Sequence, residues 1–434
     1  MSEGRGEAPA RRALTAMEEA LWFTAMLQPS SRAYHRTSGF ELRGAVTAER
    51  LQGALDALVR LHPALRTVFR RGPTGLYAEA SPSTTAALRV LPLREGGDGW
   101  KAAALHQARP YLEAPFDVAK EVFRCVYVAG DGVGLLVLQA HHIVMDALSD
   151  ELLFAHLAQA LEGGDRLVPS PAPAGDAPGD LTGPLRELCA LLEGAPALLS
   201  LSGTRPRPKQ REPAGSRQPV SLVHCAPALR ELCKQERATA FMVLLAAWAW
   251  TLSEASGERD LVIGAPFSTR RPDQERQVGC FVNMVPLRVR LEPGDTLRGL
   301  VARVRPSLMP AYAAARVPFA KVCAELRRPR ASNYHPVFQA GFTLRPAQTP
   351  SRSVAGLELI RTEADIGAYV FDWKLDLEPS AEGFRGYVEY ASDITPVDVA
   401  QRLASVFSTI SARGLASPDV PLQLLSNPEV SNVA

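Results

Sequence analysis

The sequence predicts an α+β fold made of two halves of similar size, and three observations carry this prediction. The chain has 434 residues, too many for one small hydrophobic core, so two domains are expected. Segments with helical and with strand periodicity alternate along both halves. A proline-rich stretch separates the halves from about residue 163. Heptads and short-period repeats are absent from the sequence.

Composition is that of an ordinary globular protein and argues against several classes of function. Apolar residues make up 46% and charged residues 22% of the chain, and the formal net charge is +2. So small a charge gives no reason to expect nucleic acid or an anionic membrane as a partner. The longest apolar segment, 241–252, is shorter than a membrane span. Six scattered cysteines without a Cys-x-x-Cys pair, and no apolar signal region, indicate reduced thiols in a cytoplasmic protein rather than disulfides or a zinc site.

The expected domain boundaries are placed where the composition changes along the chain, at the end of a polar N-terminal segment and on either side of the proline-rich stretch. Residues 1–13 are polar, basic and rich in Gly and Ala, so we expect a disordered tail. Residues 14–162 are assigned to an N-terminal lobe, residues 163–218 to a linker region and residues 219–434 to a C-terminal lobe.

In the N-terminal lobe, Thr15 and Glu18 stand at the positions of a capping box and start the first helix. A second helix ends where Pro63 interrupts it, and a strand begins just beyond. The turn-like Gly130–Gly132 joins two apolar strands into a hairpin. The spacing of apolar residues places helices at 15–23, 47–61, 100–112 and 148–161, and a further strand at 38–42.

Two adjacent histidines, His141 and His142, follow the second strand of this hairpin, and Asp146 lies four residues beyond His142. Neighbouring side chains of a strand point to opposite faces. One histidine should therefore face a cleft and the other the core. For an isolated pair, two structural histidines at a strand end are the more common explanation, so the rest of the chain has to decide.

The linker region is rich in proline and contains little regular structure. Four prolines fall between residues 169 and 178, and a short helix is expected near 185–192. The basic, extended segment 204–213 is interpreted as a solvated linker.

In the C-terminal lobe, the segment 239–254 is so apolar that we expect a buried helix. Pro306 and Pro310 fall inside a helical segment at 296–315, which is expected to be broken there. The other expected elements are helices at 226–237 and 396–412, strands at 261–264, 278–290, 337–344 and 357–362, and a hairpin made by 373–377 and 384–390.

An ordered series of motifs, from about residue 14 to about residue 412, resembles the condensation domains of nonribosomal peptide synthetases. His141 to Ala147 matches the His-His-x-x-x-Asp-Gly signature except at Ala147. Arg270 ends an Ile-Gly-Ala-Pro-x-x-x-Arg segment, and Asn283 lies in Gly-x-Phe-Val-Asn-x-x-Pro-Leu-Arg. Similar segments are also present at 16–23, 61–69, 204–208, 317–322 and 336–339. Their order makes the resemblance specific, because His-x-x-x-Asp alone is a weak signal.

The resemblance implies a fold similar to chloramphenicol acetyltransferase, with two such lobes arranged as a V and a tunnel between them. It also implies that substrates arrive as thioesters on phosphopantetheine. The partners would be a donor acyl or peptidyl carrier protein, and either a small-molecule acceptor or a second carrier protein. The chain itself would bind no cofactor or metal and would form no covalent intermediate. Nothing in the two-lobe arrangement requires a partner for stability, so we expect a monomer.

The resemblance also assigns roles to residues. His142 matches the catalytic position, where an imidazole can take a proton from an attacking amine or hydroxyl. Whether it is a true base or mainly positions the nucleophile is left open. His141 points the other way and would be structural. Asp146 would form a shape-giving salt bridge with Arg270 rather than act as a triad acid, and Asn283 would fix a loop at the floor of the tunnel.

Ala147 stands where the family has a glycine beside the tunnel. Its methyl group would either narrow the channel or be tolerated silently, and we favour the second. Trp373 and Tyr390 are possible substrate contacts, but core packing is the expected role of both.

The expected activity is acyl transfer from a carrier-bound thioester to an amine or hydroxyl, forming an amide or ester in nonribosomal peptide or hybrid polyketide biosynthesis. No adenylation, carrier or thioesterase motif is present and both tails are short, which favours a free-standing enzyme of antibiotic or other secondary metabolism. One alternative is an inactive recruitment platform, against which the retained His142 argues. The other is an epimerisation domain, against which the lack of a Gly-Val-Ser-Trp pattern after Asp146 argues.

Overall fold

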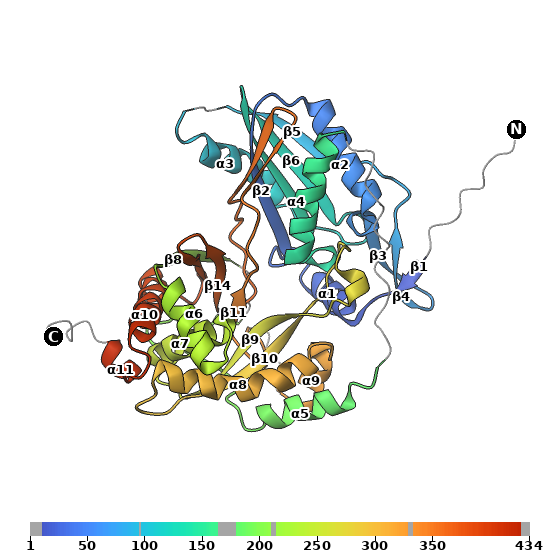
Figure 1. The fold of residues 1–434 in the computed structure, drawn as a ribbon. Coiled ribbons are helices and arrows are strands. Elements are labelled where there is room, and N and C mark those ends of the chain that lie inside the picture. The colour runs from blue at the N-terminus through green and yellow to red at the C-terminus, as the bar shows by residue number, and fades with distance from the viewer. Residues whose placement is uncertain (1–10, 95–96, 164–178, 210–213, 329–332, 427–434) are drawn as a thin grey trace, which may run out of the picture. The chain divides into compact units, whose positions relative to one another are not determined.

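The structure, a computed structural model, divides the chain into two compact units that are described separately (Figure 1). It describes residues 11–94, 97–163, 179–209, 214–328 and 333–426. Unit 1 consists of Met1–Pro178, Arg270–Val282 and Gln348–Ile366, and unit 2 of Gly179–Thr269, Asn283–Ala347 and Gly367–Ala434. Each unit combines a six-stranded sheet with helices, so the α+β class is confirmed.

Unit 1 is built on a sheet with the strand order β12-β13-β2-β7-β6-β5. All neighbours are antiparallel except β5 and β6, which are parallel. The strands are β2 (His35–Arg43), β5 (Leu88–Pro92), β6 (Phe123–Ala129), β7 (Val133–His141), β12 (Ser351–Val354) and β13 (Leu357–Thr362). A smaller sheet joins β1 (Arg11–Ala13), β4 (Gly75–Ala80) and β3 (Thr67–Gly72).

Helices cover both faces of the larger sheet of unit 1 (Figure 1). On one face lie α2 (Ala48–Leu61) and α4 (Ala147–Leu161), together with α1 (Ala16–Leu27), and on the other lies α3 (Trp100–Leu112). Alternation along β7 serves both cores, because Leu136 and Leu138 pack on the α2 and α4 side while Leu135 and Val137 pack on the α3 side. Two short 3₁₀ helices, η1 (Pro63–Arg66) and η2 (His142–Val144), follow α2 and β7.

The helices predicted in unit 1 are present, and α1, α2 and α4 start at side-chain caps, whereas α3 follows Gly99 without one. The Thr15 hydroxyl accepts from the Glu18 amide at 3.2 Å, and the Glu18 carboxylate accepts from the Thr15 amide at 2.8 Å, which completes the capping box. The Thr47 hydroxyl caps α2 by accepting from the Arg50 amide at 3.2 Å. Asp146 caps α4 by accepting from the Ser149 amide at 2.8 Å, so this carboxylate sits at a helix start.

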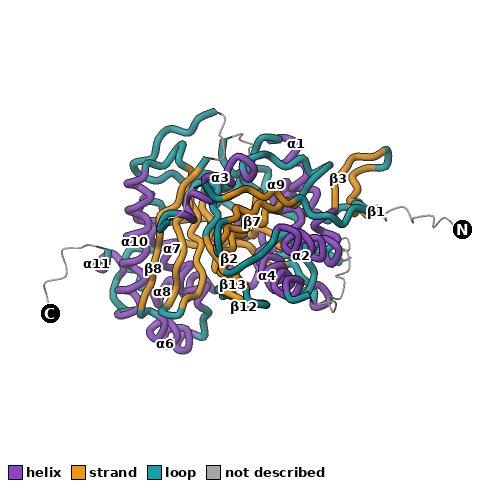
Figure 2. Tube along the Cα trace, turned by 90° about the horizontal axis from the view of Figure 1, so that it is seen from above, coloured by secondary structure: helices purple, strands orange, loops and turns teal. Residues whose placement is uncertain are grey.

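Unit 2 is built on a sheet with the strand order β10-β9-β11-β14-β15-β8. Its strands are β8 (Gly215–Val223), β9 (Asp260–Ser268), β10 (Val282–Arg290), β11 (Ala340–Leu344), β14 (Trp373–Ser380) and β15 (Gly383–Ala391). Its helices are α5 (Thr182–Leu192), α6 (Ala226–Glu236), α7 (Ala240–Ser256), α8 (Leu297–Ala313), α9 (Phe319–Glu325), α10 (Val397–Ala416) and α11 (Leu422–Leu425). Figure 2 shows α7 and α10 running beside the strands.

Tryptophans anchor the core of unit 2 by pairing a buried ring with a hydrogen bond. Trp248, on the buried helix α7, donates from Nε1 to the Gly341 carbonyl at 3.0 Å. Trp373 is fully buried and donates to the Thr395 hydroxyl at 3.0 Å. Tyr390 is also buried, so Trp373 and Tyr390 take the core positions that the sequence analysis favours.

The two units are not contiguous in the chain, whereas the predicted lobes were. The segments Arg270–Val282 and Gln348–Ile366 fall in the predicted C-terminal lobe, 219–434, but belong to unit 1. Strand pairing explains the second segment, because β13 pairs with β2. Burial explains the first, because Val278 and Cys280 pack into the core of unit 1.

Two predicted irregular regions contain regular structure where the structure describes them. Residues 11–13, placed in the expected tail, form β1 on the edge of β4. The predicted linker, 163–218, contains α5, which confirms the helix expected near 185–192, and also the start of β8, which was not expected. Residues 1–10, 164–178 and 210–213, which carry the rest of these two predictions, lie outside the described residues.

The basic segment after α5 is exposed at most of its described residues, as its charge suggested, but Arg207 departs from this prediction. Arg207 is largely buried and lies 2.6 Å from Asp372, whose carboxylate is also buried. Its guanidinium also donates to the Leu199 carbonyl at 3.2 Å. A buried carboxylate requires a partner of opposite charge, and Arg207 supplies it here.

The helix at 296–315, expected to break at its prolines, is continuous. Helix α8 runs from Leu297 to Ala313 with Pro306 and Pro310 inside it. Leu300, Val304 and Leu308 are buried, so packing of this face offsets the lost backbone hydrogen bonds.

No single helix among the described residues is long and apolar enough to cross a bilayer, although α6 and α7, bent by 103°, meet the length and composition criteria as a pair.

Candidate functional site

The histidine pair lies where β7 ends and η2 begins. β2 and β7 are neighbouring strands (Figure 2), and His35 stands opposite His141 in their register. His141 has extended backbone angles, with φ of −69° and ψ of 138°. The His142 amide then donates to the Tyr34 carbonyl at 2.7 Å, which continues the ladder by one residue. The two side chains therefore point to opposite faces of the sheet, as the alternation predicts.

His141 lies among aromatic rings on the α3 side of the sheet. It is 5% exposed, and its ring centroid lies 6.3–6.4 Å from those of Tyr34, His35 and Phe116. Its Nδ1 accepts from the Ile143 amide at 3.1 Å, so the neutral ring carries its proton on Nε2. Burial, with smaller contributions from His35 and His142, lowers the pKa of His141 to about 3. This histidine is held neutral and in one orientation.

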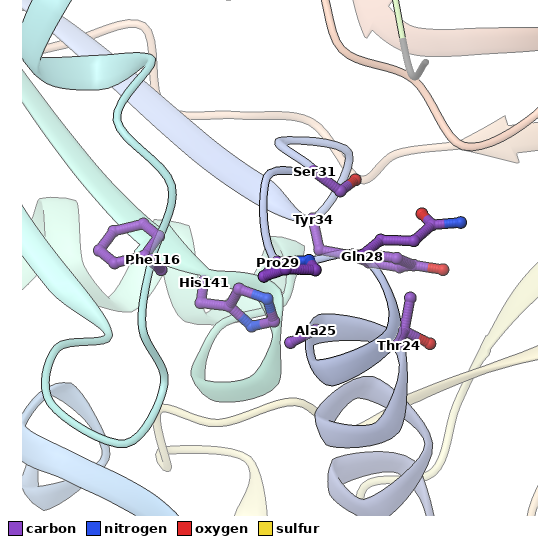
Figure 3. Close-up of a pocket in the computed structure, with 8 residues that line it drawn as sticks. All are labelled: Thr24, Ala25, Gln28, Pro29, Ser31, Tyr34, Phe116 and His141. Atoms are coloured by element: carbon purple, nitrogen blue, oxygen red, sulfur yellow. The ribbon is translucent and has the colours of Figure 1, made fainter. Parts of the chain in front are cut away.

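Figure 3 shows His141 at the wall of a small pocket near the end of α1. The free space is about 10 Å³, roughly enough for one water molecule. Its lining residues are Thr24, Ala25, Gln28, Pro29, Ser31, Tyr34, Phe116 and His141. A pocket of this size is too small for a substrate.

His142 lies on the α2 and α4 side and is half-buried, so part of it reaches solvent. Its Nδ1 is 3.6 Å from the Cys280 sulfur. Burial of the ring, followed by the positive charge of Arg36, lowers the pKa of His142 to about 4, although Asp146 opposes the shift. Burial and the Asp146 charge raise the pKa of the Cys280 thiol well above its usual range. At neutral pH the pair is therefore a neutral imidazole beside a protonated thiol.

Asp146 and Arg270 form a buried ion pair. Arg270 Nη2 lies 2.7 Å from Asp146 Oδ1, and the side chains are only 5% and 8% exposed. The same Oδ1 accepts from the Ser149 hydroxyl at 2.7 Å, and Oδ2 accepts from the Phe281 amide at 3.1 Å. Asp146 thus accepts from Arg270, Ser149 and the Phe281 amide, and among the described contacts it makes no hydrogen bond to the ring of His142, which is the geometry of a scaffold.

Arg270 holds the segment Arg270–Val282 against the start of α4. Its Nη1 donates to the carbonyls of Gln274 and Gln277, both at 2.7 Å, and its guanidinium stacks on Phe281 at 4.4 Å. Ser149 strengthens the closure, because its hydroxyl lies 2.9 Å from the Gly279 carbonyl and 3.0 Å from the Gly279 amide. This network sets where Cys280, and therefore the Nδ1 side of His142, is held.

Ala147 is the first residue of α4 and is half-buried. It is not among the described residues with positive φ, so the backbone at this position does not require glycine. The tolerance that we favoured for alanine is thus compatible with the local conformation.

Asn283 belongs to unit 2, at the start of β10. Its Nδ2 donates to the carbonyls of Ala315 at 2.9 Å and Val317 at 2.6 Å. It therefore ties β10 to the turn after α8, and both of these contacts lie within unit 2.

Three residues of this site were not singled out from the sequence. Ser149 stands three residues after the Asp146 cap, which is a recognisable capping position. Cys280 is the variable residue of a matched segment, and Arg36 lies in a strand that was identified by its apolar residues alone. No local pattern connects either of them with His142, since the connection depends on strand register and on a segment 138 residues away from His142.

In the described part of the chain, no group of three or more His, Cys, Asp or Glu side chains is arranged to hold a metal ion. All six cysteines lie in described residues, and none is bonded to another. The chemistry that this site offers is that of one neutral imidazole held on a rigid frame.

Comparison with known proteins gives a family match over most of the chain. The model of the family described as Condensation domain matches residues 10–173 and 190–429. Phosphinothricin tripeptide synthetase PhsC from Streptomyces viridochromogenes is 32% identical over 426 residues. That alignment covers 92% of this chain and 39% of PhsC, so the chain spans well under half of this relative.

Solved structures with the same fold include a nonribosomal peptide synthetase and an X-domain. The chain is similar to holo-AB3403, a four-domain nonribosomal peptide synthetase bound to AMP and glycine, with a TM-score of 0.85 and 19% identity over 97% of this chain and 34% of that one. It is also similar to the X-domain in its complex with OxyB from teicoplanin biosynthesis, with a TM-score of 0.78 and 23% identity over 98% and 97% of the two chains.

Proposed function

The chain belongs to the condensation domain family, and on this premise we propose that it transfers an acyl group from a carrier-protein phosphopantetheine thioester to an amine or a hydroxyl. The observation that carries the proposal is the state of His142. This histidine is half-buried, neutral at physiological pH and held on a rigid strand end. A neutral ring nitrogen can accept the N–H or O–H of a nucleophile.

The proposed reaction is direct transfer. The amine or hydroxyl attacks the thioester carbonyl carbon, so that a C–N or C–O bond forms and the C–S bond breaks. The nucleophile's proton passes through His142 to the departing pantetheine thiolate. The products are an amide or ester and the free thiol of the carrier, and no external oxidant or reductant is required.

The low pKa of His142 favours a role in positioning the nucleophile over a role as a strong general base. A base with a pKa of about 4 is weaker than the value near operating pH that suits general-base catalysis best. It suits a hydrogen-bond acceptor that orients the nucleophile and takes the proton late. We propose that positioning contributes at least as much as proton abstraction.

The remaining site residues are proposed as scaffold. Asp146 and Arg270 hold the segment that carries Cys280 against α4, and His141 keeps the end of β7 in one orientation. Asn283 fixes the start of β10 within unit 2. We propose that an acyl or peptidyl carrier protein delivers the donor, because PhsC, a tripeptide synthetase, is similar to this chain. The acceptor is a small molecule or a second carrier-bound group.

The experiment that tests this function is acyl transfer from a loaded carrier. A holo-carrier protein bearing an acyl thioester is incubated with the chain and with panels of amines and alcohols, and products are followed by mass. We expect transfer by the wild type and a loss of about 10²- to 10⁴-fold in His142→Ala. The matched control is His106→Ala, which removes an exposed histidine of α3.

The competing function is a recruitment platform, which is favoured by the similarity to the X-domain solved with OxyB. A platform requires the fold but not His142. If wild type and His142→Ala release the acyl group at the same slow rate across both panels, the transfer function fails and the platform takes its place. The class of accepted nucleophile decides between amide and ester formation.

A further inference from the structure

We propose that Arg36 makes an anion-binding subsite beside His142, so that one of the two substrates carries a carboxylate close to its reacting atoms. This inference rests on the proposed function and narrows it to a class of substrate. It starts from a cation on β2 that forms no ion pair with any described carboxylate.

Strand register places Arg36 and His142 together. Arg36 stands opposite Ala140 in the β2–β7 ladder, and the His142 amide bonds to the Tyr34 carbonyl at the next position beyond His141. Arg36 and His142 are therefore diagonal neighbours on one face, at a separation that a long side chain readily bridges. The positive charge of Arg36 also reaches both groups: it helps to lower the pKa of His142, and it opposes the rise that burial and Asp146 cause in the pKa of Cys280.

Arg36 has no counter-charge among the described residues. It is half-buried, its Nε is buried without a hydrogen-bond partner, and no ion pair to a described carboxylate involves it. The carboxylates whose fields reach His142 and Cys280 are Asp146 and Glu18. Each of these carboxylates already has an arginine of its own.

Asp146 is paired with Arg270 at 2.7 Å. Glu18 is paired with Arg12, whose two terminal nitrogens lie 2.6 and 2.7 Å from its two oxygens. His142 and Cys280 are both neutral at pH 7. The next carboxylate along this face, Asp150, accepts from the Ser38 hydroxyl and is paired with Arg361. Among the described residues, no ion pair therefore offsets the charge of Arg36. Loss of water from a cation without a partner is costly, so the site gains most from a ligand that brings a negative charge.

A carboxylate is the anion that fits this position. A guanidinium presents parallel N–H groups that match the two oxygens of a carboxylate. The phosphate of phosphopantetheine lies at the far end of the arm from the thioester, whereas Arg36 is beside the histidine at the reacting end. The carboxylate belongs either to the acceptor, as in a free amino acid, or to the donor acyl group, as in a dicarboxylic half-thioester.

Matched substrate pairs test the subsite and identify its source. The acceptor arm compares phenylalanine with phenylalaninamide, and the donor arm compares adipoyl with hexanoyl thioesters on the same carrier. We expect wild type to prefer the charged member of one arm by about 10- to 100-fold in kcat/KM, the range of a charge-assisted hydrogen bond. Arg36→Gln should lose that preference, chiefly through KM, while Arg36→Lys retains part of it.

The matched control is Arg43→Gln, at the other end of β2, where the arginine is half-exposed and paired with Glu41. This variant should keep the preference. If Arg36→Gln slows charged and uncharged substrates equally, Arg36 serves the reacting carbonyl oxygen and the subsite proposal is overturned. The subsite proposal is also overturned if the wild type shows no preference for the charged substrate in either the acceptor arm or the donor arm.

A binding measurement separates this proposal from the function on which it rests. 3-Phenylpropionate and 3-phenylpropanamide have the same shape and no nucleophile, and the ring signals of His142 report their binding by NMR. We expect the carboxylate alone to bind wild type and to raise the pKa of His142, and neither compound to do so in Arg36→Gln. Binding without acyl transfer would refute the proposed function only. Transfer with equal binding of both compounds would refute the subsite only.

Discussion

At the scale of single residues, the protonation state of His142 is set by its surroundings. Burial and the Arg36 charge both disfavour the imidazolium and bring the pKa to about 4, whereas an ordinary histidine titrates near 6.5. The ring is therefore neutral throughout the physiological range. Asp146 is too fully engaged by Arg270, Ser149 and Phe281 to reverse this.

This state predicts the pH dependence of acyl transfer. With a hydroxyl acceptor, which does not titrate in this range, a requirement for neutral His142 makes kcat/KM flat from about pH 6 to 8. The rate then falls as pH drops through the pKa of about 4. Removal of the Arg36 charge in Arg36→Gln moves the midpoint upward. The measurement is a pH–rate profile of wild type and this variant, and a midpoint near 6.5 in wild type would contradict the account.

Low pH also lowers the free energy of unfolding, so the pH–rate profile needs a control that reports whether the protein is still folded. His35, His62 and His141 are buried, with pKa values lowered to about 4, 3 and 3. Below pH 6.5 the unfolded chain takes up protons that the folded chain does not, so the free energy of unfolding falls as pH falls toward these values. Direct NMR titration of the His142 ring distinguishes loss of catalysis from loss of fold.

Site residues could be predicted from the sequence where they belong to a motif. They could not be predicted where strand register places them in the site. His142, Asp146 and Arg270 could be named because they stand in matched segments. Arg36 and Cys280 could not, since their position beside His142 follows from β2–β7 pairing and from the path of a distant segment. Ala147 was noticed as an exception, and the ordinary backbone at the start of α4 is compatible with alanine there.

At the scale of elements, the start of α4 is the point where the site is assembled. Asp146 is at once the helix cap, the partner of Arg270 and the acceptor of the Phe281 amide. The segment Arg270–Val282 is thereby held by one carboxylate and by the Ser149 hydroxyl. A change at Asp146 should therefore be felt as loss of structure rather than as a specific loss of chemistry.

We predict that Asp146→Ala lowers the free energy of unfolding by about 3–5 kcal/mol, because Arg270 is left buried without its counter-charge. Arg270→Met should have a comparable effect, and Asp273→Ala, which removes an exposed partner of Arg271, should have little. Chemical denaturation measures all three. Full stability in Asp146→Ala with activity abolished would instead assign this aspartate a catalytic role.

Most helices and strands were predictable because each has a local cause. Thr15 and Thr47 cap helices, and the turn at 130–132 forces a hairpin. The failures have non-local causes. The face of α8 buried in unit 2 carries that helix through Pro306 and Pro310, and a buried Asp372 draws Arg207 out of its predicted solvated linker.

At the scale of the whole molecule, the chain order does not correspond to the folding units. Two segments from the C-terminal half complete unit 1: one supplies Arg270, Val278 and Cys280, and the other supplies β13 at the sheet edge next to β2. A division into contiguous lobes misses this exchange, because composition changes at linkers while strand pairing ignores sequence distance.

The exchange predicts that residues 11–163 do not fold alone. Without the two later segments, β2 loses its neighbour β13 and Asp146 loses Arg270, while Arg361 no longer pairs with Asp150 at 2.7 Å. We expect the fragment to lack a cooperative unfolding transition by circular dichroism and to lack slowly exchanging amides in β2. Cooperative unfolding of the fragment at the stability of the full chain would contradict this reading of unit 1.

The central claim is that neutral His142 takes part in acyl transfer, and a single-turnover rate tests it most directly. The carrier-bound acyl group is followed by mass at pH 7 with saturating acceptor, for wild type, His142→Ala and the exposed control His106→Ala. The account predicts a fall of about 10²- to 10⁴-fold in His142→Ala alone, with its fold intact. Equal rates in wild type and a folded His142→Ala would contradict it.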